Sequence, residues 1–318
     1  MLLGQRFPLE LEDVRRRAER EFFVALDDRA TLVLWQKRAG VAFPVMERAI
    51  KRMGLPEDLK YVAVIESGLK NRARSWAGAV GPWQFMPATG RENGLRVSKG
   101  VDRRRDLEQS TESALKFLSR LHNRFDDWFL ALAAYNAGPA RVSRSLSKQD
   151  VKSYWDVSLP NEAERYVARV AAAKMILSSP ERYGVLIPED ERFRPHATSS
   201  VEVKTGSAIK VLKLARMART TYRHIREINP WITSDVLPAG RHSIVVPKSG
   251  AQGFATRVAA ATPKRAKKKK RGVRHRVREG DTLGLVAAKY GTTVAELTRR
   301  NKIRKADMIY PGQLLKVR

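Results

Sequence analysis

One glutamate, Glu66, ends an apolar stripe in the stretch between Leu55 and Ser67. It is the next position on a helical face that already carries three apolar residues, Leu59, Val62 and Ala63. Burial disfavours the charged form of a carboxylate, so a buried Glu66 would keep its proton near neutral pH and act as a general acid. The local pattern alone favours the alternative, a Glu at a helix end that turns to solvent.

The flanking sequence predicts the elements that would position this acid. Pro56 suits the first turn of a helix, and Ser67 and Gly68 suit its end. Upstream, residues 31–54 predict two helical pieces that meet at Phe43–Pro44. The acid is therefore expected at the end of a short helix that follows a longer helical region.

A glycine-rich loop with the sequence WAGAVGPWQFMP follows, between Trp76 and Pro87. Gly78 and Gly81 give the backbone freedom to let a ligand approach closely. The flat apolar surfaces and the amide that come next suit sugar rings and their hydroxyls: Trp83, Gln84 and Phe85. On its own, the same loop is equally a tight turn over a core.

A third segment, Ala134–Gly138, ends a run that is apolar on all sides and predicts a buried helix. The run delivers Tyr135 and Asn136 just before Gly138–Pro139. Taken alone, Tyr135 is a core tyrosine with a satisfied hydroxyl, and Asn136 is as much a turn cap as a site residue.

Together, the pair Glu66–Ser67, the loop Gly78–Pro87 and the segment Ala134–Gly138 resemble the lytic transglycosylases of bacterial cell walls, glycoside hydrolase family 23. The resemblance covers about residues 35–185. Within that family, a catalytic domain followed by LysM modules resembles the membrane-bound lytic murein transglycosylase D type. The loop departs from the family pattern at Pro82, where an apolar residue is common.

The resemblance implies a single acid and base, Glu66, and no cofactor or metal. Glu66 would protonate the bond between N-acetylmuramic acid and N-acetylglucosamine, then act as base while the muramic acid's C6 hydroxyl forms a 1,6-anhydro ring. The Tyr135 hydroxyl would face the substrate or Glu66, and Glu162 and Tyr166 would line or brace the cleft, with bracing favoured for Glu162. The substrate-binding set implied in this way is Ser67, Gly78, Gly81, Trp83, Gln84, Phe85, Met86, Tyr135, Asn136, Glu162 and Tyr166.

A two-carboxylate hydrolase needs a second acid facing the sugar. The motif segments offer no obvious partner for Glu66, and Asp102 and Asp106 lie in an Arg-rich loop, where we expect salt bridges. A lysozyme-like hydrolase that makes a reducing end remains one alternative. A wall-binding protein with a decayed catalytic domain is another, which the intact Glu66, Tyr135 and loop oppose.

The last segment, residues 275–318, reads as strand, helix, helix, strand, with Thr282 and Thr293 capping the two helices and Gly291 ending the first. It resembles a LysM module, which binds glycan containing N-acetylglucosamine. The glycan-binding residues expected from the resemblance are Gly280, Asp281, Thr282, Leu283, Asn301, Ile309, Pro311 and Gly312.

Residues 200–248 repeat this pattern weakly. Pro238-Ala239-Gly240 parallels Pro311-Gly312, and Asn229 parallels Asn301, but the Gly-Asp-Thr signature is replaced by Gly206-Ser207-Ala208. We interpret the segment as a degenerate LysM-like module.

The composition adds a strong electrostatic bias. The chain has 318 residues, a formal net charge of +29, no cysteine, and five histidines without metal-ligand spacing. Residues 249–274 are expected to be a basic linker, and the run from Lys264 to Arg278 is expected to be a solvated tether that adheres weakly to anionic wall polymer or to a membrane surface. Specific nucleic-acid binding is not expected, because the run lacks interleaved aromatics and a reading motif.

The predicted fold class is α+β, with a mostly helical, lysozyme-like catalytic domain followed by small βααβ modules. The predicted divisions are a helical segment at 1–34, the catalytic domain at 35–185, the degenerate module at 200–248, the linker at 249–274 and the LysM domain at 275–318. We expect a monomer of the cell envelope, periplasmic or associated with the outer membrane. No stretch approaches the ~20 apolar residues of a membrane span, and the first residues lack the apolar core of a signal peptide.

Overall fold

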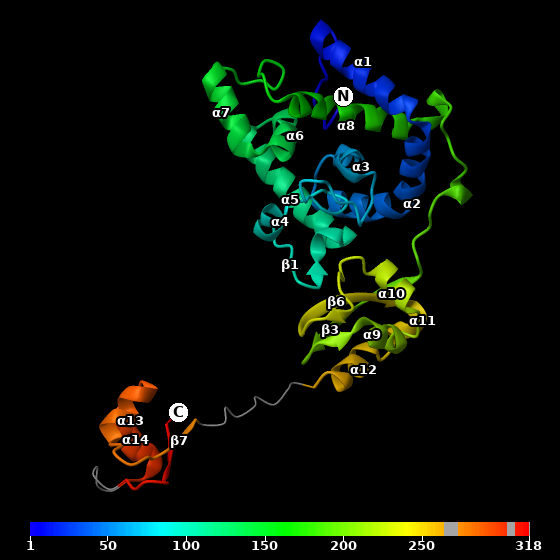
Figure 1. Cartoon of the computed structure of the whole chain (residues 1–318). Coiled ribbons are helices and arrows are strands. Elements are labelled where there is room, and N and C mark those ends of the chain that lie inside the picture. Colours follow the sequence, from blue (N-terminus) through cyan, green and yellow to red (C-terminus); the bar gives the residue numbers. More distant parts are fainter. Residues whose placement is uncertain (264–272, 304–308, 318) are drawn as a thin grey trace. The chain divides into compact units, whose positions relative to one another are not determined.

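The helix α6 (Trp128–Ala137) forms the centre of the helical part of the chain, and every residue from Trp128 to Ala134 is buried. It is apolar all round because α5 (Leu107–Phe125), α7 (Pro139–Gln149) and α8 (Asn161–Ser178) pack around it (Figure 1). The computed structural model describes residues 1–263, 273–303 and 309–317, and the chain divides into two units, 1–263 and 264–318.

The helix α2 (Arg29–Arg52) joins this core, and α1 (Glu12–Asp27) packs on a smaller apolar cluster of Leu32, Ile176 and Val185, so the two helices do not form a separate segment. α1 packs along α8, and Leu2 and Leu3 are buried in the main core. The predicted division at residue 34 therefore falls inside α2.

The expected break at Phe43–Pro44 is absent, since α2 continues through Pro44. Proline lacks the N–H that would bond the carbonyl of Gly40. The chain packs tightly at that turn, because a Cβ on Gly40 would lie 2.5 Å from the carbonyl oxygen of Phe193. Tertiary packing has thus overridden the local helix-breaking signal.

Short elements connect these helices and carry the site. The turn η1 (Glu57–Leu59) leads into α3 (Lys60–Ser67), which ends at Gly68 in the left-handed conformation. After the glycine-rich loop come α4 (Pro87–Glu92), the hairpin of β1 (Val97–Ser98) and β2 (Val101–Asp102), and the turn η2 (Arg103–Arg105). Two turns, η3 (Pro180–Tyr183) and η4 (Glu189–Glu191), follow α8.

The next part of the first unit, here called the middle module, covers residues 198–262. Its long strands β3 (Thr198–Thr205) and β6 (Gly240–Pro247) pair antiparallel, with Val201 opposite Ile244. Between them lie β4 (Ile209–Lys210), α9 (Val211–Met217), α10 (Tyr222–Ile228) and β5 (Val236–Leu237), and β4 pairs with β5.

The predicted linker at 249–274 is wrong over its first half. α11 (Lys248–Ala251) and α12 (Phe254–Ala261) follow β6 directly, and Phe254 and Val258 are fully buried in the core of the middle module. The alanine-rich composition that suggested a linker also suits a helix packed on a small core. Most of the basic run, residues 264–272, lies outside the described residues.

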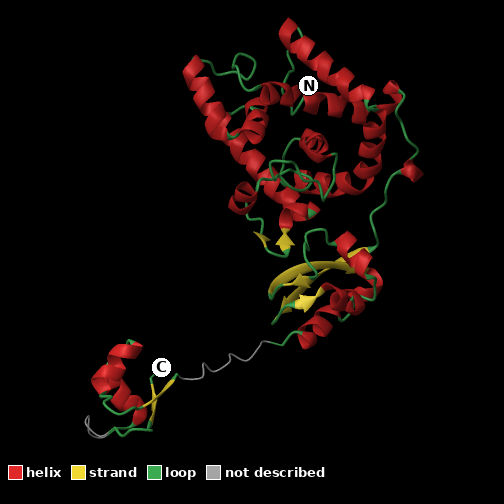
Figure 2. Cartoon of the chain, viewed as in Figure 1, coloured by secondary structure: helices red, strands yellow, loops and turns green. Residues whose placement is uncertain are grey.

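The second unit contains β7 (Arg274–Arg276), α13 (Leu283–Tyr290), α14 (Val294–Asn301) and β8 (Leu314–Lys316), with β7 and β8 antiparallel. Its core is small and includes Val277, Leu283, Val286, Leu297 and Leu315. The predicted fold class, helical domain first and βααβ modules after it, is confirmed (Figure 2). In the described ranges we find no helix with the length and apolar character that a membrane crossing requires.

Candidate active site

Glu66 lies in the last turn of α3, on the floor of a cleft of about 600 Å³. The glycine-rich loop, the end of α6 and the start of α8 supply most of the residues that line this cleft. Glu66 is half-buried, so its carboxyl group is surrounded by protein but still reaches the cleft. The predicted helix-terminal Glu therefore faces the cleft rather than bulk solvent.

Burial raises the pKa of Glu66 from 4.5 to about 7. The hydroxyl of Tyr166 opposes this, because it donates a 2.5 Å hydrogen bond to Glu66 Oε1, and the positive charge of Arg169 opposes it as well. The negative charge of Glu162 adds to the rise. A carboxyl group that is about half protonated near neutral pH can both give and take a proton.

Replacing Tyr166 with Phe removes the hydrogen bond that favours the charged form of Glu66. The pKa of Glu66 should then rise, and the alkaline limb of the pH–rate profile should move to higher pH by about one pH unit. Tyr135→Phe is the matched control, since the Tyr135 hydroxyl donates to the Trp83 carbonyl oxygen at 2.7 Å instead. A limb that stays fixed in Tyr166→Phe, or moves equally in both variants, would contradict the assignment.

The Tyr135 hydroxyl, expected to face the substrate or Glu66, lies near Glu66, because burial and the Glu66 charge both raise the pKa of Tyr135. Tyr135 lines the cleft, but its hydroxyl holds the glycine-rich loop through Trp83, and Tyr166 is the tyrosine that bonds Glu66. Both side chains end near the same cleft, and sequence spacing could not say which hydroxyl reaches the acid.

Four of the predicted substrate-binding residues support the loop and lie outside the cleft lining. Trp83 is fully buried and donates through Nε1 to Thr111 Oγ1 at 3.0 Å. Ser67 Oγ donates to the Pro82 carbonyl at 2.8 Å and so ties the end of α3 to the loop. The other two are Gly78 and Gly81.

Gly81 allows close approach of protein backbone, not of a ligand. A Cβ at this position would lie 1.8 Å from the carbonyl oxygen of Arg104, and its φ is +89°. The remaining predicted residues do line the cleft: Gln84, Phe85, Met86, Tyr135, Asn136, Glu162 and Tyr166. Of these, Glu162 forms an ion pair with Arg169, at 3.2 Å between Oε1 and Nη1.

Arg104 supports the glycine-rich loop, and the sequence motifs did not predict this role. Its guanidinium pairs with both carboxylate oxygens of Asp102, at 2.9 and 2.8 Å, and donates to the carbonyls of Gly78 and Phe85 at 3.1 and 2.9 Å. The expected salt bridges of the Arg-rich loop are present, because Asp106 pairs with Arg103 at 2.6 Å. The three consecutive arginines at 103–105 were the feature of the sequence that could have indicated such a role.

Two further cleft residues were also missed. Arg169 lines the cleft from α8, where its charge acts on Glu66. Trp76 lines the cleft from the loop, and its side chain is 100% exposed. A fully exposed indole beside an acid is a stronger signal for ligand contact than the buried Trp83. Over the described residues, no three His, Asp or Glu side chains gather in a way that would hold a metal ion.

Comparison with known proteins matches two family models, a transglycosylase SLT domain at residues 44–158 and a LysM domain at residues 275–318. The chain contains an SLT domain and a LysM domain. Membrane-bound lytic murein transglycosylase D of Escherichia coli is 32% identical over 287 residues, which cover 84% of this chain and 61% of that protein. Peptidoglycan transglycosylase gp16 of Escherichia phage T7 is 30% identical over 150 residues, 46% of this chain and 11% of that protein.

In the LysM domain, most of the predicted glycan-binding residues hold the fold. Asp281 Oδ2 accepts from the Arg278 backbone N–H and pairs with His275 Nε2, each at 2.8 Å, and the hydrogen bonds from Arg278 and His275 lower the pKa of Asp281. Thr282 caps α13 and Leu283 is buried. Gly280 and Gly312 adopt φ of +84° and +91° in turns, and Ile309 and Pro311 precede the final strand.

Asn301 joins α14 to the last strand rather than facing a ligand. Its amide donates to the carbonyls of Leu297 and Lys316 and accepts from the Lys316 N–H at 2.7 Å. In the middle module, Asn229 bonds Ile225 and Val245 in the same pattern, including an N–H accepted from Val245 at 2.8 Å. The shared bracing geometry supports the inferred internal repeat.

Proposed function

We propose that this protein is a peptidoglycan lytic transglycosylase that cleaves the bond between N-acetylmuramic acid and N-acetylglucosamine, with Glu66 as its single acid and base. The observation that carries the proposal is the raised pKa of Glu66 in a cleft lined by sugar-compatible side chains. The SLT domain supplies the reaction class. Glycan strands of peptidoglycan are the proposed substrate.

In the proposed reaction, protonated Glu66 gives its proton to the glycosidic oxygen as the bond to the anomeric carbon breaks. The Glu66 carboxylate then takes the proton of the muramic acid's C6 hydroxyl, whose oxygen bonds to the anomeric carbon. Glu66 ends protonated, as it began, and no water is consumed. The Tyr166 hydrogen bond stabilises the carboxylate between these two steps, and burial keeps its basicity high enough for the second.

Trp76 is the proposed stacking surface for a sugar ring at the mouth of the cleft. Trp76→Ala should raise KM for soluble glycan strands about tenfold and change kcat little, because stacking binds substrate and transition state alike. Phe23→Ala is the control, since Phe23 is 62% exposed and belongs to α1, outside the cleft lining. An unchanged KM in Trp76→Ala would contradict the role.

The LysM domain is proposed to hold the enzyme on glycan. A chain that lacks residues 275–318 but keeps the basic run at 264–272 should sediment more weakly with insoluble peptidoglycan yet keep its kcat on soluble strands. The measurement is a pull-down with sacculi beside a soluble-substrate assay. Loss of turnover on soluble strands, or unchanged sedimentation, would contradict targeting.

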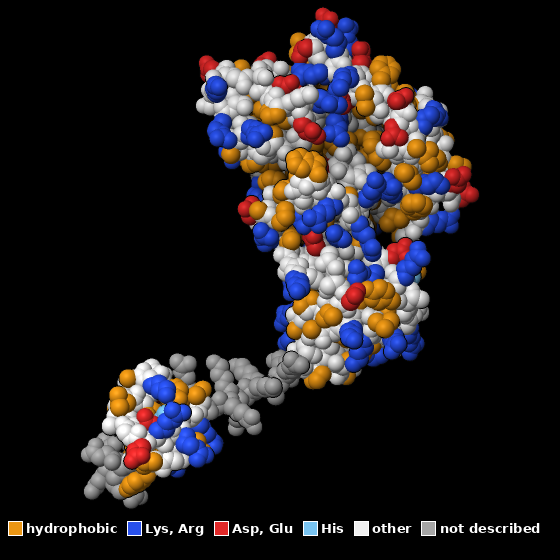
Figure 3. All heavy atoms as spheres, in the orientation of Figure 1, with side chains coloured by type: hydrophobic (Ala, Val, Ile, Leu, Met, Phe, Trp, Pro, Cys, Tyr) orange, Lys and Arg blue, Asp and Glu red, His pale blue; other side chains and the backbone are white. Residues whose placement is uncertain are grey.

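The charge pattern suggests where the enzyme works. Figure 3 shows Lys and Arg side chains spread over the visible faces of the units, in keeping with the net charge of +29. We propose a location in the cell envelope, periplasmic or at the outer membrane, with weak adhesion of the basic run to anionic wall polymer or to a membrane surface. We propose that the enzyme acts as a monomer.

A second candidate, a lysozyme-like hydrolase, is favoured by one observation: Glu162 is another carboxylate in the same cleft. Its ion pair with Arg169 and its 69% exposed side chain suit bracing better than activation of a water. The test is mass spectrometry of soluble products released from sacculi. Anhydro-ended products from wild type and from Glu162→Gln support the transglycosylase, and reducing-end products that need Glu162 support the hydrolase.

A further inference from the structure

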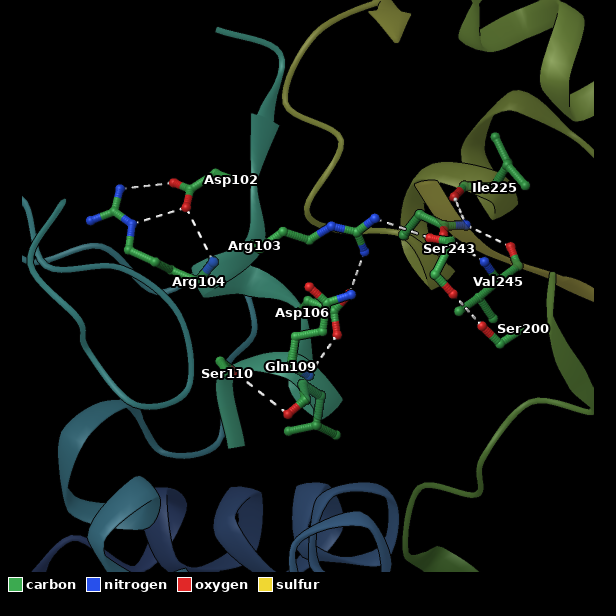
Figure 4. A network of polar contacts seen from close by, with 12 residues as sticks. Asp102, Arg103, Arg104, Asp106, Gln109, Ser110, Ser200, Ile225, Ser243 and Val245 are labelled. Carbon is green, nitrogen blue, oxygen red and sulfur yellow. Dashed lines mark hydrogen bonds and ion pairs between the residues drawn. The ribbon is translucent and has the colours of Figure 1, made fainter. Parts of the chain in front are cut away.

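The adjacent residues Arg103 and Arg104 leave the turn η2 in opposite directions (Figure 4). Arg104 turns toward Asp102 and the glycine-rich loop, whereas Arg103 reaches into the middle module. Both side chains are buried, at 7% exposure for Arg103 and 6% for Arg104. Two buried guanidinium groups on one three-residue turn connect two parts of the fold that are distant in sequence.

On the loop side, Arg104 hydrogen-bonds the backbone of the glycine-rich loop at two positions. Its bonds to the Gly78 and Phe85 carbonyls span the segment that supplies Gln84 and Phe85 to the cleft. The Arg104 carbonyl also fills the space that a side chain on Gly81 would need. A shift of η2 would therefore move the loop with it.

On the module side, Arg103 stacks on Trp231, with the guanidinium carbon 3.4 Å from the ring centroid. Its Nη1 pairs with Asp106 at 2.6 Å and its Nη2 donates to the Ser243 carbonyl at 3.1 Å. Trp231 is 1% exposed, so the contact is desolvated. Cation–π contacts are strongest under these conditions.

The hairpin before η2 is built into the middle module as well. Val101 is fully buried in the core of that module, and the backbones bond in both directions, from Asp102 N to Trp231 O at 2.8 Å and from Thr233 N to Gly100 O at 3.1 Å. Gly100 has φ +84°, and a Cβ there would lie 2.8 Å from Ser234 Oγ. The turn is thus fixed from the module side.

We propose that the middle module is a brace for the substrate-binding loop, and that Arg103 and Trp231 are positioning residues that act on the cleft through Arg104. The module has lost the Gly-Asp-Thr signature of its repeat, and its buried Trp231 stacks on Arg103 of the catalytic domain. The kinetic part of this inference rests on the proposed function. The structural coupling does not.

The test is hydrogen exchange of residues 78–86 in the full chain, read together with kinetics. In Arg103→Ala and Trp231→Ala, the loop amides of Val80 and Gln84, which bond Phe85 and Gly81, should exchange about tenfold faster. KM should rise several-fold, while the alkaline limb set by Glu66 should stay in place, because Tyr166 and Arg169 come from α8.

Arg72→Ala is the matched control, because Arg72 also reaches the middle module, at the Arg226 carbonyl, whereas only its charge acts on Arg105 of η2. It should leave loop exchange and KM unchanged. If Trp231→Ala fails to fold, Arg103→Lys replaces it in the test. This variant keeps the positive charge near Asp106 but loses the planar stacking on Trp231. Unchanged loop exchange in the Arg103 and Trp231 variants, or equal acceleration in Arg72→Ala, would overturn the proposal. An inactive wild-type protein would contradict the proposed function but would not affect the hydrogen-exchange test of the structural coupling.

Discussion

Glu66→Gln is expected to lower the rate of glycan cleavage by about 10³-fold or more, because the amide can neither donate nor accept the proton that both steps require. Wild-type activity should fall as pH rises through about 7, where the buried carboxyl loses its proton. The measurement is product release from soluble strands over a pH series. Retention of more than a tenth of the wild-type rate would contradict the single-acid assignment.

The same substitution should stabilise the fold at alkaline pH. The folded state binds the Glu66 proton more tightly than the unfolded chain, so stability falls as pH rises between about 4.5 and about 7. The full difference corresponds to about 3 kcal/mol, reduced where water reaches the carboxyl group. Thermal unfolding of Glu66→Gln should therefore show a higher Tm than wild type above pH 7 and a smaller gain below pH 5.

Arg104→Ala is expected to produce the largest loss of stability, about 3–5 kcal/mol, because it breaks a buried ion pair and leaves the Asp102 carboxylate without its main partner. The carbonyls of Gly78 and Phe85 lose their donor as well, so the loop should loosen and KM should rise. Chemical denaturation measures the first effect and initial-rate kinetics the second.

Arg105→Ala is the control for this prediction. Arg105 belongs to the same turn, but its side chain is 23% exposed and only reaches Asp102 at 4.0 Å. It should cost about 1 kcal/mol or less. Equal losses in the two variants would show that charge in the turn, rather than the Arg104 hydrogen bonds, stabilises the loop.

Short-range patterns predicted the elements that carry the site. The stripe ending at Glu66, the all-apolar run of α6 and the capping threonines Thr282 and Thr293 each express a local rule, and the structure follows them. The expected helix end at Pro44 was wrong, since α2 continues through this proline and the chain at Phe193 lies close against the turn before it.

The roles within the site depended on long-range contacts that spacing does not encode. Trp83 meets Thr111 across 28 positions, and Tyr166 meets Glu66 across 100. Aromatic residues in a sugar-binding motif are equally suited to core and to ligand, and only burial separates Trp83 from Trp76. The sequence also could not show that the Asn301 amide bonds the backbone of β8 at Lys316 and not a ligand.

Digestion of purified peptidoglycan in water enriched in heavy oxygen, with mass spectrometry of the products, distinguishes intramolecular attack from hydrolysis. An intramolecular attack by the C6 hydroxyl predicts muropeptides that are lighter by one water than hydrolysis products and carry no heavy oxygen. These products should be absent with Glu66→Gln and present with Glu162→Gln. Heavy oxygen at a new reducing end of the wild-type products would show that water attacks the anomeric carbon and that the enzyme is a hydrolase.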